Sequence, residues 1–200
     1  MQIKVINFES WKANMYIVSN QNTALVIDPS YSYEIANETA KKEITAVLIT
    51  HGHYDHICEL DSYVKANVPI YGSVNLKAML ESDSKNCSIL FGERFIINTK
   101  YNLIDEKFTI NDMTITVYKT PGHTECSVCY VIKNSMFSGD TLFKGSIGRT
   151  DLPTGDLTKM VRSLKMLKSL GNSLSVFPGH GESTILLKEK NENYYMRKYD

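Results

Sequence analysis

Five histidines form the clearest chemical pattern in this sequence of 200 residues. Three of them stand with an aspartate in one short string, His51-x-His53-x-Asp55-His56. The other two, His123 and His180, each follow a Pro-Gly pair. Imidazole nitrogens and carboxylate oxygens are common metal ligands, and so dense a string seldom arises by chance. The pattern therefore predicts a metal site that uses every histidine of the chain.

The spacing within the string indicates room for two ions. In an extended or loosely coiled segment, His51 and His53 project to the same side and can bind one ion. Asp55 and His56 then point past that ion toward a second one. The two Pro-Gly-His turns, which come from the other half of the chain, can complete both coordination spheres. We therefore expect a dinuclear centre.

A carboxylate that bridges the two ions is still required, and Asp140 is the candidate because it follows a short predicted strand. Ligands without thiolate suit zinc, iron or manganese, and we expect two divalent ions, with Zn²⁺ the first choice. Such ions lower the pKa of bound water to about 7, so a metal-bridging hydroxide can attack a carbonyl or phosphoryl group. No nucleophilic serine motif and no phosphate-binding loop is found. The chemistry expected is hydrolysis, with Asp55 and Asp140 as catalytic residues.

Strand and helix patterns place these side chains just beyond strand ends. The strands expected in the first half are residues 3–8, 15–18, 24–27, 44–49 and 69–71. The helices expected there are residues 31–42, 59–66 and 74–80, followed by a polar loop, 81–102, that overhangs the site. The second half predicts strands at 108–110, 114–119, 128–132, 136–138 and 175–177. Its helices are an amphipathic one over 157–170 and a last one over 184–193.

Two successive β-rich runs, each closed by helices, predict a mixed α/β (α+β) chain. Two sheets would pack face to face with helices outside, as a four-layer αββα sandwich. We expect residues 1–200 to form one domain, because no Pro-, Gly- or Ser-rich linker divides them.

Composition narrows the range of partners. Lys plus Arg and Asp plus Glu number 22 each, so the net charge is zero and nucleic-acid binding is not expected. The N-terminus has no apolar run of the length of a signal peptide or membrane span, and the four cysteines suit a reducing compartment. We expect a cytoplasmic enzyme with a small-molecule substrate and no membrane partner.

The order of the ligands resembles that of the metallo-β-lactamase superfamily along nearly the whole chain. Within it, residues 139–153 (Gly-Asp-Thr-Leu-Phe-Lys-Gly-Ser-Ile-Gly-Arg-Thr-Asp-Leu-Pro) resemble the short bacterial glyoxalase II-like hydrolases. The resemblance implies the metallo-β-lactamase fold. It also implies hydrolysis of a thioester such as S-lactoylglutathione to a hydroxy acid and a free thiol.

The resemblance further implies how the ligands are divided between the ions. The ligands implied for the first ion are His51, His53 and His123. Those implied for the second are Asp55, His56 and His180, with Asp140 as the bridge.

Two further residues receive roles outside the ligand set. Asp28 matches a family aspartate beside the metal loop and is expected to orient a ligand, with simple turn capping as the alternative. Arg149 is expected to bind a substrate carboxylate, since guanidinium suits bidentate recognition. The alternative for Arg149 is a surface ion pair with Asp151. Longer glyoxalase II enzymes hold glutathione with a C-terminal helical domain, which is not expected here because the sequence ends 20 residues after His180.

The nearest rival function is a persulfide dioxygenase of the same fold, with one iron held by His51, His123 or its neighbours, and Asp140. The string Gly148-Arg149-Thr150-Asp151-Leu152-Pro153 favours the hydrolase. A β-lactamase is expected less, because no signal peptide is found and position 140 is aspartate instead of cysteine.

Overall fold

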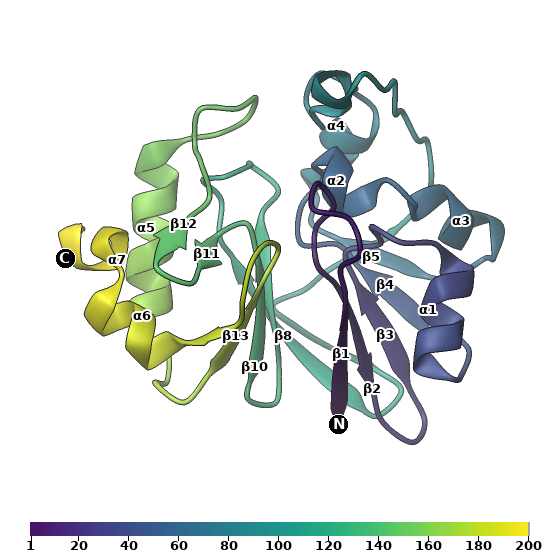
Figure 1. Ribbon diagram of the computed structural model, residues 1–200, viewed down its shortest axis with the longest axis horizontal. Helices are drawn as coiled ribbons and strands as arrows, with labels where there is room; N and C mark the ends of the chain where they lie inside the picture. The colour runs from purple at the N-terminus through teal and green to yellow at the C-terminus, as the bar shows by residue number, and fades with distance from the viewer. Residues whose placement is uncertain (200) are drawn as a thin grey trace.

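The computed structural model describes residues 1–199, in which two β-sheets lie between two layers of helices (Figure 1). The first sheet has the order β1-β2-β3-β4-β5-β6. Its strands are β1 (Gln2–Ile6), β2 (Met15–Ser19), β3 (Ala24–Ile27), β4 (Ala46–Leu48), β5 (Ile70–Gly72) and β6 (Asn102–Leu103). The helical segments of this half are α1 (Tyr33–Ala40), α2 (Tyr54–Ile57), α3 (Leu60–Lys65), α4 (Leu76–Leu80) and the 3-10 turn η1 (Ser88–Phe91).

The second sheet has the order β14-β13-β10-β9-β8-β7. Its strands are β7 (Lys107–Ile110), β8 (Met113–Lys119), β9 (Val128–Ile132), β10 (Ser135–Gly139), β13 (Ser175–Pro178) and β14 (Thr184–Ile185). A separate hairpin pairs β11 (Leu142–Phe143) with β12 (Ser146–Ile147). The helices α5 (Leu157–Lys168), α6 (Leu186–Glu192) and α7 (Tyr194–Lys198) cover the outer face. No helix within residues 1–199 is long and apolar enough to span a bilayer.

Three apolar cores separate the four layers, and the two-residue period of the strands explains them. In β2, Met15 and Ile17 point outward to the helices of the first half, whereas Tyr16 and Val18 point inward to the second sheet. Strands β3 and β4 alternate in the same way. On the far side, the α5 residues Met160, Leu164 and Leu167 pack on the outer face of the second sheet. The predicted αββα sandwich is thus confirmed.

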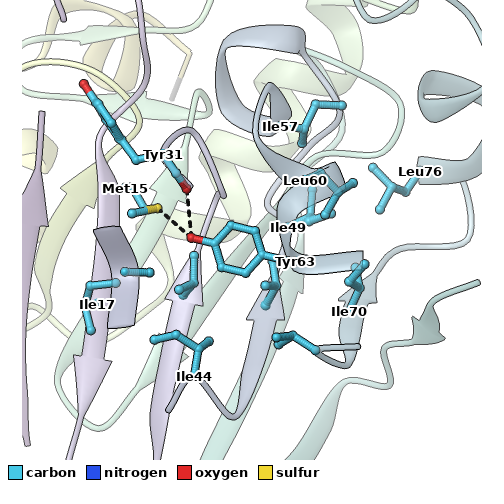
Figure 2. Close-up of a cluster of buried hydrophobic side chains, with 14 of the residues drawn as sticks. Met15, Ile17, Tyr31, Ile44, Ile49, Ile57, Leu60, Tyr63, Ile70 and Leu76 are labelled. Carbon is cyan, nitrogen blue, oxygen red and sulfur yellow. Dashed lines mark hydrogen bonds between the residues drawn. The ribbon is translucent and has the colours of Figure 1, made fainter. Parts of the chain in front are cut away.

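Tyr63 lies at the centre of the core between the first sheet and its helices (Figure 2). Its ring is fully buried, and its hydroxyl donates a hydrogen bond of 2.9 Å to the carbonyl of Tyr31. Leu60, one turn earlier on α3, is also fully buried in this core. These contacts fix α3 to the sheet, directly after the segment that carries the predicted metal ligands.

The two sheets are also joined by hydrogen bonds at one end of the sandwich. The backbone amide of Val128 donates to the carbonyl of Thr50 at 2.9 Å. The Tyr130 hydroxyl donates to the carbonyl of Ile49 at 2.8 Å. Gly139 adopts φ 47°, and a Cβ there would overlap the Thr50 side chain. Glycine at this position therefore permits the close approach of β10 to the segment after β4.

Three expectations for the first half were wrong in detail. The segment 51–56 is not extended throughout, because His53 caps the short helix α2, and the His56 amide bonds to the His53 carbonyl at 3.0 Å. The predicted helix 31–42 is shorter, since Lys41 takes the left-handed conformation that ends α1. The segment 81–102 contains η1 and is not simply a loop.

In the second half, the expected helix over 184–193 begins as the strand β14, and only then continues as α6. The hairpin of β11 and β12 and the helix α7 were not predicted. Strands of two residues carry too little periodicity to be recognised from sequence.

We expect Leu60→Ala to lower the free energy of unfolding by about 2–5 kcal/mol, because it leaves a cavity under α3. Leu187→Ala is the control, since Leu187 is 43% exposed, and its effect should stay within about 0.5 kcal/mol. Urea unfolding of the chelator-treated proteins measures both. Equal losses in the two variants would contradict the packing described for α3.

Candidate metal centre

The predicted ligands meet where the carboxyl ends of five strands converge. Asp28 follows β3, and the string from His51 to His56 follows β4. In the second sheet, His123 follows β8, Asp140 follows β10, and His180 follows β13. Because β8, β10 and β13 run in one direction, their ends open at the same edge of that sheet.

The first group of ligand atoms consists of one atom each from His51, His53 and His123. These atoms lie within 4.8 Å of one another. The Nδ1 of His53 is 2.8 Å from the Nε2 of His123. All three residues are buried. This is the set that the family resemblance implied for the first ion.

The second group belongs to Asp55, His56 and His180, again within 4.8 Å of one another. The Nε2 of His180 is 2.9 Å from Oδ2 of Asp55, and the Nε2 of His56 is 3.9 Å from the same oxygen. The first turn of α2 places Asp55 and His56 side by side. The side chain of His180 is 34% exposed, so this group lies on the open side of the site.

Asp140 lies between the two groups. Its Oδ1 is 3.2 Å from Nε2 of His56, and its Oδ2 is 3.5 Å from Nε2 of His123. The same Oδ2 is 3.7 Å from Nε2 of His180. One carboxylate thus reaches ligand atoms of both groups, which is the placement that a bridging ligand needs.

Several of these atoms have no hydrogen-bond partner. Within residues 1–199, the buried side-chain atoms in this state are His51 Nε2, His53 Nε2, His56 Nε2 and Asp140 Oδ1. An unpaired buried polar atom costs about 1–3 kcal/mol. Although His56 Nε2 and Asp140 Oδ1 are only 3.2 Å apart, they lack hydrogen-bond geometry. Cations held between such atoms would satisfy them, so the residues present fit a metal centre.

Hydrogen bonds behind the ligands fix the orientation of the rings. The Nδ1 of His56 is 2.8 Å from Oδ2 of Asp28, which also accepts a bond of 2.6 Å from the Thr50 hydroxyl. The Nδ1 of His123 is 2.8 Å from the carbonyl of Arg149. With the proton on Nδ1, each ring turns the lone pair of its Nε2 toward the site.

Electrostatics favour added positive charge at this place. Burial, followed by the neighbouring imidazoles, lowers the pKa of His51 well below its ordinary value, and burial lowers that of His53 to about 3. Burial would also lower the pKa of His56, but the surrounding carboxylates, led by Asp140, raise it well above the ordinary value. The carboxylates beside His56 supply the negative charge expected at a site that receives cations.

The side chain of Arg149 forms the surface ion pair with Asp151 that was given above as the alternative to substrate binding. Its guanidinium donates two hydrogen bonds of 2.7 Å to Asp151, and both side chains are exposed. Only the backbone of Arg149 contacts a predicted ligand, through the carbonyl that accepts from His123.

Asn14 was missed in the sequence, although it clamps the segment around His180. Its backbone amide donates to the carbonyl of Gly179 at 2.7 Å. Its side-chain amide donates to the carbonyls of Pro178 and Gly181, both at 3.0 Å. The one signal in the sequence was a polar residue directly before an apolar strand. That signal does not identify the contact partner, Pro178, which lies 164 residues away.

Two six-stranded sheets with buried histidine and aspartate groups at one end define a metal-binding αββα protein. The model of the metallo-β-lactamase superfamily matches residues 11–180, and the chain belongs to this superfamily.

Curated relatives agree with this placement. A "probable metallo-hydrolase" of Streptococcus pyogenes is 34% identical, with 95% of this chain and 88% of the relative covered. The hydroxyacylglutathione hydrolase GloC of Haemophilus influenzae is 26% identical, with 98% of each covered.

Solved structures show the same fold at similar length. The BLEG-1 B3 metallo-β-lactamase is 31% identical with a TM-score of 0.88, covering 98% of this chain and 99% of that one. The di-iron-bound form of TTHA1623 is 27% identical with a TM-score of 0.85, covering 96% and 99%. The chain thus belongs to a superfamily of metallo-hydrolases, and the relatives leave its substrate open.

We expect Gly179→Ala to lose bound metal, because the added Cβ would overlap Asp140 Oδ1 and the ring of His56. Gly171→Ala is the matched control, since nothing lies within 4 Å of a Cβ there. Metal content by mass spectrometry after dialysis, with melting of the metal-free proteins, separates a local effect from unfolding. Full metal content in Gly179→Ala would refute the packing described here.

Removing the Asn14 clamp should loosen the second ligand group. We expect Asn14→Ala to weaken the binding of one ion about 10–100-fold, as for other residues behind metal ligands, and the other ion less. Asn37→Ala, which removes a 3.0 Å hydrogen bond to the Ile44 amide far from the site, should leave both affinities unchanged. Titration with Zn²⁺ against a chromophoric chelator measures both. Unchanged binding in Asn14→Ala would show that the clamp does not position His180.

Proposed function

We propose that the chain is a dinuclear metal hydrolase that cleaves a thioester such as S-lactoylglutathione. The observation that carries the proposal is the position of Asp140 between two groups of ligand atoms. A one-iron dioxygenase would hold its ion with His51, His123 or its neighbours, and Asp140, whereas the group of Asp55, His56 and His180 on the other side of Asp140 favours two ions.

The residues proposed to hold the first ion are His51, His53 and His123. Those proposed for the second are Asp55, His56 and His180, with Asp140 shared. Bound divalent cations, most simply Zn²⁺ with iron or manganese as alternatives, would supply Lewis acidity and a water of lowered pKa. Asp28 is proposed to hold the His56 ring through its 2.8 Å contact, beyond any role in the turn.

The remaining chemistry is that of the chain itself. The carboxylates of Asp55 and Asp140 place negative charge and acceptor oxygens on the open side of the site. There they can orient an attacking water. All five histidines lie in the two ligand groups, so none is free to act as a general acid. A thiolate leaves without prior protonation more readily than an amine or alkoxide, so this site suits a thioester.

The substrate is proposed to be a small molecule that enters beside His180, the most exposed ligand. Its side chain is 34% exposed, against 4% for His123 and 0% for His56. Arg149 is proposed to exchange Asp151 for a substrate carboxylate, because exposed ion pairs contribute only about 0–1 kcal/mol.

The relatives support hydrolysis and supply the second candidate. GloC is named for hydrolysis of a hydroxyacylglutathione, and this chain matches it end to end. The B3 metallo-β-lactamase shares fold, length and 31% identity, which makes β-lactam hydrolysis the alternative. The likeness to this β-lactamase weakens the argument against β-lactam hydrolysis that rests on aspartate at position 140.

The test is turnover of a panel with S-lactoylglutathione, simple acyl thioesters and a chromogenic β-lactam. We expect thioester hydrolysis with two ions bound per chain. In Asp140→Asn, thioester turnover should fall at least about 1000-fold, and bound metal should be lost. His56→Ala should be similarly inactive. Gly171→Ala, a surface change, is the control.

Rapid turnover of the β-lactam alone would favour the second candidate. Thioester turnover with only one ion, or full activity in Asp140→Asn, would refute the dinuclear assignment.

A further inference from the structure

Three aromatic rings form an exposed surface next to the metal centre. Trp11 stacks on Tyr54 with centroids 6.0 Å apart, and Phe91 contacts both rings at 5.5 Å. Trp11 is 39% exposed and Phe91 is 43% exposed. We call these three residues the aromatic wall. Ile89 and Leu90, at 49% and 67% exposed, extend its apolar surface.

The wall is built from segments that are tied to the ligands. Tyr54 stands between His53 and Asp55 in the sequence. Its amide donates to the carbonyl of Asn86 at 2.8 Å, which anchors the segment that carries Phe91. The amide of Ala13 donates to the carbonyl of Asp55 at 3.2 Å, which anchors the segment that carries Trp11. Both segments lie at the end of the sandwich that holds α2 (Figure 1).

The wall is also held in place without a ligand. Asn86 is fully buried, and its side chain donates to the carbonyl of Phe95 at 2.7 Å and accepts from the amide of Ser88 at 2.9 Å. The ring of Phe95 packs on Tyr54 at 5.4 Å. Apolar side chains that a fold fixes in an exposed position mark a binding surface.

The cations near the ligand segments are paired with carboxylates, so the exposed surface of the wall itself is apolar. Lys12 is buried and lies 3.1 Å from Glu9. Arg149 is paired with Asp151, and Lys144 is paired with Glu182. These three cations, which border the ligand segments, are thus already neutralised.

We propose that the aromatic wall binds the apolar part of the substrate, so that the preferred thioesters carry an extended alkyl or aryl group. That the occupant is a thioester rests on the proposed function. Because Tyr54 follows His53 and precedes Asp55, the backbone of the wall adjoins both ligand groups, and an extended acyl group is needed to run from the ions to the rings.

The test compares two N-acetylcysteamine thioesters that differ only in the acyl chain, acetyl and hexanoyl. We expect kcat/KM for hexanoyl to exceed that for acetyl by about tenfold or more, since partial burial of four methylenes on the wall favours it. Phe91→Ala should reduce this ratio about tenfold. Leu187→Ala, equally exposed at 43%, is the control and should leave the ratio unchanged.

Trp11 gives a second readout because it is the only tryptophan in the chain. The metal-loaded protein is titrated with the uncleavable thioethers S-hexyl- and S-methyl-N-acetylcysteamine. We expect a saturable blue shift of Trp11 emission with the hexyl compound, none with the methyl compound at the same concentration, and about tenfold weaker binding in Phe91→Ala.

The two readouts separate failure of this inference from failure of the proposed function. Hydrolysis of both thioesters at equal rates, with no response of Trp11, would overturn the role of the wall and leave the hydrolase intact. A specific Trp11 shift without any thioester hydrolysis would support an apolar ligand on the wall and refute the thioester function.

Discussion

The constraint on which the site depends is the burial of imidazole nitrogens and a carboxylate oxygen that have no hydrogen-bond partner. His56 Nε2 and Asp140 Oδ1 lie 3.2 Å apart, and neither has a hydrogen-bond partner. Burial removes the water that could solvate such atoms, so leaving them unpaired is costly. Cations placed among them turn this unfavourable arrangement into a stable one.

The fold maintains this arrangement through atoms that never touch an ion. Thr50 accepts the Val128 amide across the sheets and donates to Asp28, which in turn holds His56. Thr50 therefore links the joining of the two sheets to the orientation of a ligand. Asn14 does the same for the segment of His180. The site is consequently a property of both halves of the sandwich, because each half supplies ligands and restrains those of the other.

The ligand groups could be predicted because their information is local. Histidines two residues apart after a strand end, and histidines after Pro-Gly turns, define side-chain directions without any tertiary structure. The four layers followed from the two-residue alternation in strands such as β2 and from the apolar stripe of α5. The order of the strands within each sheet was not predicted, because it depends on contacts between segments far apart in the sequence.

The errors lie where tertiary contacts decide the outcome. The helix α2 has only four residues, and the amide of Tyr54 at its start is held by the carbonyl of Asn86. Asn14 acts on residues 164 positions away. No pattern within a short window contains these contacts.

The most direct measurement is a crystal structure of the protein purified without added metal, with anomalous scattering recorded at the absorption edges of zinc, iron and manganese. The account predicts two anomalous peaks, one contacted by the histidines of the first group and one by Asp55, His56 and His180, with Asp140 touching both. A single peak, or an active crystal with none, would contradict it.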